Sequence, residues 1–308
     1  MIIDADGHYT PEFHFNEKWF IDYRNRKNNA FSDAEVRVTE LAEIGVDKQV
    51  LNPMGPSLGL LYNMDASTAS MVMRRYNDFM RDLSTRYECF EYNIWLPLQS
   101  VDASLYEIDR LLDSDYFGIH VSDMPYWGFI PSMNLFWDKI SKLGVPWYSH
   151  FTFASDTIIL DQHIPSEFAD LQELWKHDTW KFSLASIILG NVIDNYPDFK
   201  IIIAERDINW IKDFRETLVN RGFKDPMPYL QNNFWFTIEP ESETFIDDAK
   251  YIGFDRLLFA TDWPHEFDAG GANSMEDTRT VQQLNISDSD KEKIFFGNYY
   301  TAKNKFRN

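Results

Sequence analysis

The chain has 308 residues, 44% of them hydrophobic and 16% aromatic, so a disordered chain is excluded and a large core is expected. Its formal net charge of −20 repels phosphate backbones and anionic lipid, which argues against nucleic-acid and membrane partners. The single cysteine, Cys89, excludes an intrachain disulfide and a cysteine-rich metal site. The first residues lack a basic start followed by an apolar run, which favours a cytoplasmic location.

Short apolar runs alternate with segments of helical spacing along the whole chain. Helical spacing is clearest in residues 66–87, 104–112, 135–143 and 184–196. The apolar runs, each predicted to be a strand, are residues 2–3, 48–52, 91–98, 117–121, 145–150, 199–204, 234–237 and 256–260. This alternation is typical of βαβ units that build a buried parallel sheet.

Eight such units in one chain predict an α/β fold of the (β/α)8 TIM-barrel type, formed by a single domain over residues 1–308. An open doubly wound sheet is the alternative, and it is disfavoured because no glycine-rich phosphate loop follows any predicted strand. Three longer segments follow the first, fifth and eighth strands, at residues 9–32, 151–176 and 266–274. We expect them to be long loops over the mouth of the barrel, where such folds carry their active sites.

Polar residues of ligand type follow four of the predicted strands. Asp6 and His8 lie two residues apart in the first strand, so their side chains share one face. His150 ends the fifth strand, Glu205 follows the sixth and Asp262 follows the eighth. Because the carboxyl ends of parallel strands meet at one edge, we expect these side chains to lie close together. Two imidazoles together with carboxylates suit one divalent metal ion. Zn²⁺ is the first choice, and Mn²⁺ and Fe²⁺ are the alternatives. For Glu205 an ion pair with Arg206, or another local ion pair, is the structural alternative.

Several longer motifs carry a family resemblance. The segments IIDADGH, GVPWYSH, IIIAERDINWI and DRLLFATDWPH make the chain similar to the amidohydrolase superfamily, in the branch related to aminocarboxymuconate semialdehyde decarboxylase. The resemblance implies that Asp6, His8, His150 and Asp262 bind the metal ion and that Asp262 also handles a proton. It further implies a homodimer.

Two positions depart from the family pattern. Asp6 stands where the family has histidine or glutamate, and Glu205 stands where its decarboxylases usually have histidine. A carboxylate at position 205 should repel a substrate carboxylate, but it can act as a general base. We therefore expect a metal-dependent hydrolase that cleaves a C–N or lactone C–O bond of a small molecule or peptide side group, with Asp262 and Glu205 as catalytic residues.

Two other functions remain open. The first alternative is non-oxidative decarboxylation of an aromatic or unsaturated carboxylic acid, and the second is a catalytically silent barrel that binds a ligand. In each case the residues expected to contact the ligand are His120, Trp127, Phe151, Trp263 and His265. For the aromatic residues core packing is the competing interpretation, and for His265 it is a structural hydrogen bond.

Overall fold

The computed structural model describes residues 1–11, 32–53, 64–122, 127–150, 164–238, 240, 242–263 and 274–303, without the side chains of residues 122 and 274–277. Most of the three predicted mouth loops therefore lies outside the described residues. The second loop is described from residue 164 onward, where it is partly helical, and the third only at residue 274.

Strands form at all eight positions expected from the sequence. They are β1 (Ile3–His8), β2 (Lys48–Asn52), β3 (Phe90–Tyr92), β4 (Ile94–Trp95), β5 (Ile119–Ser122), β6 (Trp147–His150), β7 (Ile201–Ile203), β8 (Phe234–Ile238) and β9 (Leu257–Phe259). The predicted strand over residues 91–98 corresponds to the pair β3 and β4, which Asn93 separates.

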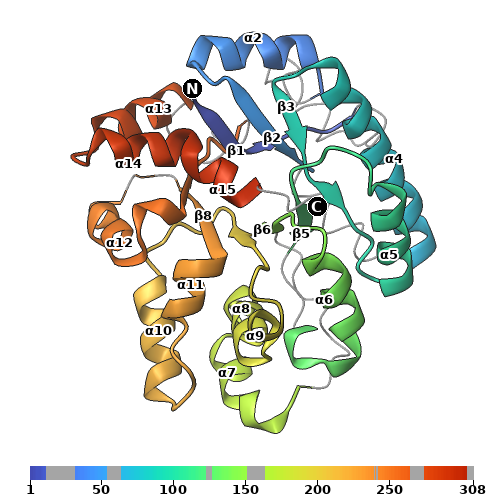
Figure 1. Cartoon of the computed structure of the whole chain (residues 1–308), viewed down its shortest axis with the longest axis vertical. Coiled ribbons are helices and arrows are strands. Elements are labelled where there is room, and N and C mark those ends of the chain that lie inside the picture. The colour runs from blue at the N-terminus through green and yellow to red at the C-terminus, as the bar shows by residue number, and fades with distance from the viewer. Residues whose placement is uncertain are drawn as a thin grey trace.

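Helices surround the strands on all sides in Figure 1. The α-helices of the described residues are α2 (Ala34–Ile44), α4 (Ala66–Arg86), α5 (Val101–Arg110), α6 (Asn134–Ser141), α7 (Ala169–Leu174), α8 (Thr179–Leu189), α9 (Val192–Asn195), α10 (Ile211–Asn220), α11 (Met227–Asn233), α12 (Phe245–Ile252), α13 (Ser274–Gln283), α14 (Asp288–Glu292) and α15 (Asn298–Lys303). The shorter turns are η2 (Trp127–Phe129), η3 (Pro131–Met133), η4 (Ser166–Phe168), η5 (Phe254–Arg256) and the π-helical η7 (Lys293–Gly297). None of the helices in these ranges is long and apolar enough to cross a bilayer.

One predicted helix, over residues 184–196, is two helices in the structure. The chain passes from α8 to α9 through Gly190 and Asn191, and Asn191 has a left-handed φ of 63°. Gly190 packs against the backbone of Gly128, where an added Cβ would lie 1.9 Å from the Gly128 carbonyl oxygen. This close approach excludes any side chain at position 190.

Strand pairing is parallel throughout the described sheets. One sheet has the order β1-β2-β3 and the other the order β4-β5-β6-β7-β8-β9. The segment after β9 runs beside β1, because Gly7 and Trp263 form a parallel bridge and the amide of His8 donates to the carbonyl of Trp263 at 2.8 Å. The described residues thus form a parallel α/β fold whose first and last strands are neighbours.

The core has two parts, because alternate residues of each strand face opposite sides. The larger part lies between strands and helices and includes Ile201 and Ile203 of β7. The smaller part, which we call the interior cluster, consists of the intervening residues of the strands together with residues of α15. Its buried members are Ile3, Ala5, Val50, Phe117, Tyr148, Ile202, Ala204, Trp235, Leu258, Tyr299 and Ala302.

Candidate metal centre

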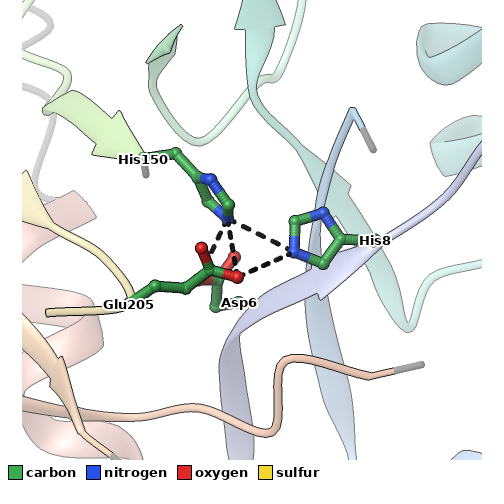
Figure 2. Close-up of side chains that lie close together, drawn as sticks. All are labelled: Asp6, His8, His150 and Glu205. Atoms are coloured by element: carbon green, nitrogen blue, oxygen red, sulfur yellow. Dashed lines mark hydrogen bonds and ion pairs between the residues drawn. The ribbon is translucent and has the colours of Figure 1, made fainter. Parts of the chain in front are cut away.

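Four ligand-type side chains converge where strands end. Asp6, His8, His150 and Glu205 each present one nitrogen or oxygen atom, and all four atoms lie within 4.8 Å of one another. Figure 2 shows them pointing toward a common centre. The side chains of Asp6, His8 and His150 are at most 2% exposed, whereas that of Glu205 is 18% exposed and reaches the solvent side of the group. All four were expected at this edge from the sequence.

A β-bulge in β1 turns Asp6 and His8 toward the centre. Asp4 pairs with Gln49 and Gly7 pairs with Leu51, so β1 contains one residue more than β2 between these pairs. Ile3 and Ala5 belong to the interior cluster, and strict alternation would therefore direct Asp6 outward, toward the helices. Because the bulge changes the phase of the alternation, Asp6 and His8 face inward instead. The sequence predicted that they share a face, but it did not reveal the bulge.

Backbone geometry also directs Glu205 and Asp262. Glu205 has a left-handed φ of 54° and Asp262 one of 51°, a conformation that non-glycine residues rarely adopt and that is found preferentially at functional sites. The amide of Glu205 donates to Oγ1 of Thr237 at 3.1 Å, and the amide of Asp262 donates to the carbonyl of Asp6 at 3.0 Å. These hydrogen bonds hold both strained turns in place.

The distances within the group fit a bound cation. Nε2 of His8 lies 3.3 Å from Nε2 of His150, and Oδ2 of Asp6 lies 3.6 Å from the same His150 atom. Two ligands held about 2.1 Å from one tetrahedral ion are separated by about 3.4 Å. Oδ2 of Asp6 is buried and accepts no hydrogen bond from the described residues, which is costly for a carboxylate unless a cation binds it. The donor set therefore fits a divalent ion.

The tautomer of His8 supports the same conclusion. Its Nδ1 lies 3.2 Å from the carbonyl oxygen of Pro53, and because a carbonyl can only accept, Nδ1 carries the proton. The lone pair is then on Nε2, the atom that faces the group. Metal-binding histidines are commonly oriented in this way.

Asp262 lies beside the group and contacts His8. Its Oδ1 is 2.9 Å from Nε2 of His8, although Asp262 is not among the four residues whose atoms all lie close together. Burial, together with the charge of Glu205, raises the pKa of Asp262 well above its usual range. Burial acts in the same direction on Glu205, but the charges of His150 and His8 outweigh it and hold the pKa of Glu205 below its usual range. The two neighbouring carboxyl groups thus differ strongly in their affinity for a proton.

A buried amide pair, which the sequence pattern did not single out, orients the group. Nδ2 of Asn52 donates to Oδ1 of Asp6 at 2.7 Å, and Nδ2 of Asn93 donates to Oδ1 of Asn52 at 2.7 Å. His120 joins this network through Nδ1, which lies 3.2 Å from the same oxygen of Asn52. Burial, with the charges of His150 and His8, lowers the pKa of His120 well below its usual value. Asn52 ends a predicted strand, so the rule that identified His150 could have found it.

A second buried network supports the backbone around the site. Arg37 of α2 is fully buried and donates to the carbonyl of His8 at 2.7 Å, to the carbonyl of Trp263 at 3.3 Å and to Oε1 of Gln49 at 2.9 Å. Gln49 in turn donates to Oδ2 of Asp4 at 2.6 Å. This network joins β1 to the residue after Asp262. Arg37 lies outside the four segments in which the sequence pattern predicted a helix, and nothing in that pattern pointed to this network.

The residues predicted to contact a ligand have different surroundings. His120 is buried with its ring centroid 5.3 Å from that of His150. Trp127 is 4% exposed and packs edge-on against Phe136 in the core. The indole N–H of Trp263 donates to Oε2 of Glu40 on α2 at 3.1 Å.

Two of the residues predicted to contact a ligand, Phe151 and His265, lie outside the described residues.

A cavity of about 500 Å³ opens beside Glu205 and is lined partly by Trp180, Lys181, Arg206 and Trp210. The guanidinium of Arg206 lies over the Trp180 ring, 4.8 Å from its centroid, whereas the ion-pair contacts of Glu205 among the described residues are with His8 and His150. The alternative of an ion pair between Glu205 and Arg206 is thus not found among the described residues.

Fold and site together define an α/β protein with a cation-binding group at the carboxyl ends of parallel strands. The family model for Amidohydrolase (Amidohydro_2) matches residues 3–298. The chain belongs to this family, which confirms the resemblance seen in the sequence.

Comparisons with individual proteins point to one type of reaction in the relatives. Gamma-resorcylate decarboxylase of Polaromonas sp. (strain JS666) is 27% identical over 93% of this chain and 91% of the relative. A solved 2,6-dihydroxybenzoate decarboxylase with bound 2,6-dihydroxybenzoate has a TM-score of 0.77 and 20% identity, and the match covers 98% of both chains. A dihydroxybenzoic acid decarboxylase from Polaromonas sp. JS666, with manganese and the inhibitor 2-nitroresorcinol, has a TM-score of 0.75 and 20% identity over 98% of this chain and 96% of that one.

These findings correct two expectations. Hydrolysis was wrong as the main prediction, because the relatives are decarboxylases. That prediction treated Glu205 as an isolated negative charge, whereas its carboxylate lies among the candidate metal ligands, 3.7 Å from Nε2 of His8 and 3.4 Å from Nε2 of His150. Zinc as the first choice of metal is not supported either, since similar solved structures that name their metal contain manganese.

Proposed function

We propose that this protein is a metal-dependent, non-oxidative decarboxylase of an aromatic carboxylic acid that bears a hydroxyl group next to the carboxylate. The observation that carries the proposal is the similarity to gamma-resorcylate decarboxylase over nearly the full length of both chains. The convergence of Asp6, His8 and His150 supports it independently, because these residues suit a divalent cation, for which Mn²⁺ is the first candidate.

The reaction assigns different tasks to the residues of the site. Asp6, His8 and His150 would hold the ion, and the chemistry that a divalent cation supplies there is stabilisation of negative charge on the substrate oxygens. Asp262, 2.9 Å from His8, would donate a proton to the ring carbon that carries the carboxylate. The carbon–carbon bond then breaks, its electron pair stays with the ring, and CO₂ leaves. Water returns the proton to Asp262.

Room for such a substrate exists beside the site. The cavity at Glu205 has a volume of about 500 Å³, within the range of ligand pockets for small molecules. His120 is oriented by Asn52, so its ring is fixed close to the ligand group. We expect it to contact the substrate without carrying a charge.

The test is turnover of 2,6-dihydroxybenzoate and related ortho-hydroxybenzoates by the Mn²⁺-loaded protein in D₂O. We expect CO₂ release and one deuterium on the ring carbon that lost the carboxylate, observed by NMR. Asp262→Asn should lose at least about 100-fold in kcat, the usual contribution of a positioned acid, whereas the exposed control Asp82→Asn on α4 should not. A folded, Mn²⁺-loaded protein that releases no CO₂ from any member of the series would overturn the proposal and leave a ligand-binding role.

We also propose that the two sheets close into one eight-stranded barrel in a single domain, with β3 and β4 acting as one strand. Tyr92 of β3 pairs with Leu51 of β2, and Ile94 of β4 pairs with Ile119 of β5, so the chain from β3 to β4 lies between both sheets. The Gly7–Trp263 bridge supports closure on the other side. The interior cluster, which draws residues from both sheets, is what a closed barrel requires.

A further inference from the structure

The side chains of His8 and Asp262 meet across the junction between β1 and the segment after β9. Two backbone hydrogen bonds span this junction: the amide of His8 donates to the carbonyl of Trp263 at 2.8 Å, and the amide of Asp262 donates to the carbonyl of Asp6 at 3.0 Å. Gly7 and Trp263 form an isolated bridge here rather than a continuous ladder. The 2.9 Å contact between Oδ1 of Asp262 and Nε2 of His8 therefore depends on what else holds the junction together.

Arg37 of α2 holds both sides of this junction. One terminal nitrogen of its guanidinium donates to the carbonyl of His8 at 2.7 Å, and the other donates to the carbonyl of Trp263 at 3.3 Å. Because the guanidinium is planar and rigid, it fixes the separation of these two carbonyls. Glu40, one turn further along α2, accepts a hydrogen bond from the indole N–H of Trp263 at 3.1 Å. The helix therefore holds Trp263 by its backbone and by its side chain.

The residue before Asp262 is held by the same network. Asp4 accepts hydrogen bonds from the amide and the hydroxyl of Thr261, at 3.1 Å and 2.6 Å. Gln49 connects the two ends of the network, because it donates to Asp4 at 2.6 Å and accepts from Arg37 at 2.9 Å. The chain is thus anchored on both sides of Asp262, whose left-handed φ of 51° is a strained conformation that persists only where the surroundings determine it.

The chemistry of Arg37 suits a positioning role. Arg37 is 0% exposed, and burial of a charge is costly unless hydrogen bonds compensate for the lost water. Two of its hydrogen bonds go to backbone carbonyls at the site itself. A lysine ammonium is a compact point charge on a flexible stem, so it could not hold both carbonyls in the same geometry.

We propose that Arg37 is a positioning residue of the reaction, which sets the separation of His8 and Asp262 through its hydrogen bonds to the carbonyls of His8 and Trp263. It acts through the backbone of the site and not by contact with the substrate. The expected effect on turnover rests on the proposed function, whereas the effect on the junction does not.

The experiment compares Arg37→Lys with a matched control, Arg110→Lys on α5. Arg110 is 16% exposed and donates to the carboxylates of Glu107 and Asp78 at 2.6 Å each, so its replacement costs stability without touching the junction. Urea unfolding measures that loss in both variants. Hydrogen exchange of the metal-free proteins, followed by NMR, measures opening of the junction, and kinetics at saturating Mn²⁺ measures kcat and KM for 2,6-dihydroxybenzoate.

We expect the amide protons of His8 and Asp262 to exchange at least about tenfold faster in Arg37→Lys than in Arg110→Lys. In Arg37→Lys kcat should fall at least about tenfold while KM stays within about threefold of the wild-type value, because the reacting groups are misplaced but the substrate still binds. Arg110→Lys should keep both kinetic constants within about twofold of the wild-type values.

Equal exchange rates at these two amides in both variants, or an unchanged kcat in Arg37→Lys, would overturn the inference and leave Arg37 with a role in stability alone. If Arg37→Lys does not fold, Gln49→Met replaces it, because this change removes the acceptor that orients the guanidinium; it should speed the same exchange and lower kcat. A wild-type protein that releases no CO₂ contradicts the proposed function, and the exchange rates of the metal-free variants then decide the role of Arg37 by themselves.

Discussion

The side-chain amide of Asn52 donates a 2.7 Å hydrogen bond to Oδ1 of Asp6, and the other oxygen of that carboxylate faces Nε2 of His150 at 3.6 Å. Asn52 is itself held by Asn93 at 2.7 Å. An amide pair at the ends of two neighbouring strands therefore determines which way a ligand oxygen points. Such supporting hydrogen bonds often matter nearly as much to metal affinity as the ligands do.

Replacement of Asn52 by alanine should weaken Mn²⁺ binding by about 10- to 100-fold, because Asp6 and His120 both lose their orienting partner. Calorimetric titration of the metal-free variant measures the change. The exposed amide of Asn232 in α11 provides the matched control, and Asn232→Ala should bind as the wild type does. Unchanged affinity in Asn52→Ala would mean that Asp6 is oriented without this amide.

Gly7→Ala should destabilise the protein by at least about 1–3 kcal/mol, the usual cost of overpacking. A Cβ at position 7 would lie 2.2 Å from Nε2 of Gln49, and Gln49 cannot retreat without losing its hydrogen bonds to Asp4 and Arg37. Urea unfolding measures the change in the free energy of unfolding. Gly297→Ala is the control, since a Cβ there meets nothing closer than 3.7 Å; equal stabilities for the two variants would contradict the argument.

Mn²⁺ should stabilise the folded protein, because the four ligand atoms come together only in the native state. At a free concentration of 100 times Kd, binding of one ion adds about 2.7 kcal/mol to the free energy of unfolding. Thermal unfolding with and without a chelator measures this gain. It should vanish in a His8→Ala/His150→Ala variant; a gain that survives both substitutions would indicate that Mn²⁺ binds elsewhere.

The ion-pair cluster at Glu91 predicts a pH dependence of stability that does not involve the metal group. Glu91 is 7% exposed and lies 2.8 Å from Nζ of Lys48 and 2.7 Å from Nζ of Lys303. Burial raises the pKa of Glu91, but the two lysines outweigh it and hold the pKa below the usual 4.5. Because the folded-state pKa is the lower one, the stabilisation is complete above about pH 4.5 and is lost as the pH falls through the folded-state value.

Glu91→Gln should accordingly lower the free energy of unfolding by about 2 kcal/mol at pH 7, and the difference from the wild type should shrink below about pH 4.5. Urea unfolding at a series of pH values measures both effects. Glu173→Gln, an exposed acid on α7, should show a much smaller difference at every pH. A deficit for Glu91→Gln that persists unchanged at low pH would show that packing, not charge, accounts for it.

Much of the architecture was predictable because it depends on local pattern. The eight apolar runs all became strands, since their length, apolar character and flanking residues suffice to specify buried parallel strands. The break between α8 and α9 was not predictable, because it depends on contact between Gly190 and Gly128, far apart in the chain.

The sequence by itself determined which side chains meet at the site. Asp6, His8, His150, Glu205 and Asp262 each lie at or just after the end of a buried parallel strand, and such ends gather at one edge of the fold. The tertiary structure alone decided the direction in which each of these side chains points. A bulge set by pairing with β2 turns Asp6 inward, and left-handed turns held by Thr237 and by Asp6 aim Glu205 and Asp262. These features depend on hydrogen bonds between distant segments, for which the local residue pattern carries no signal.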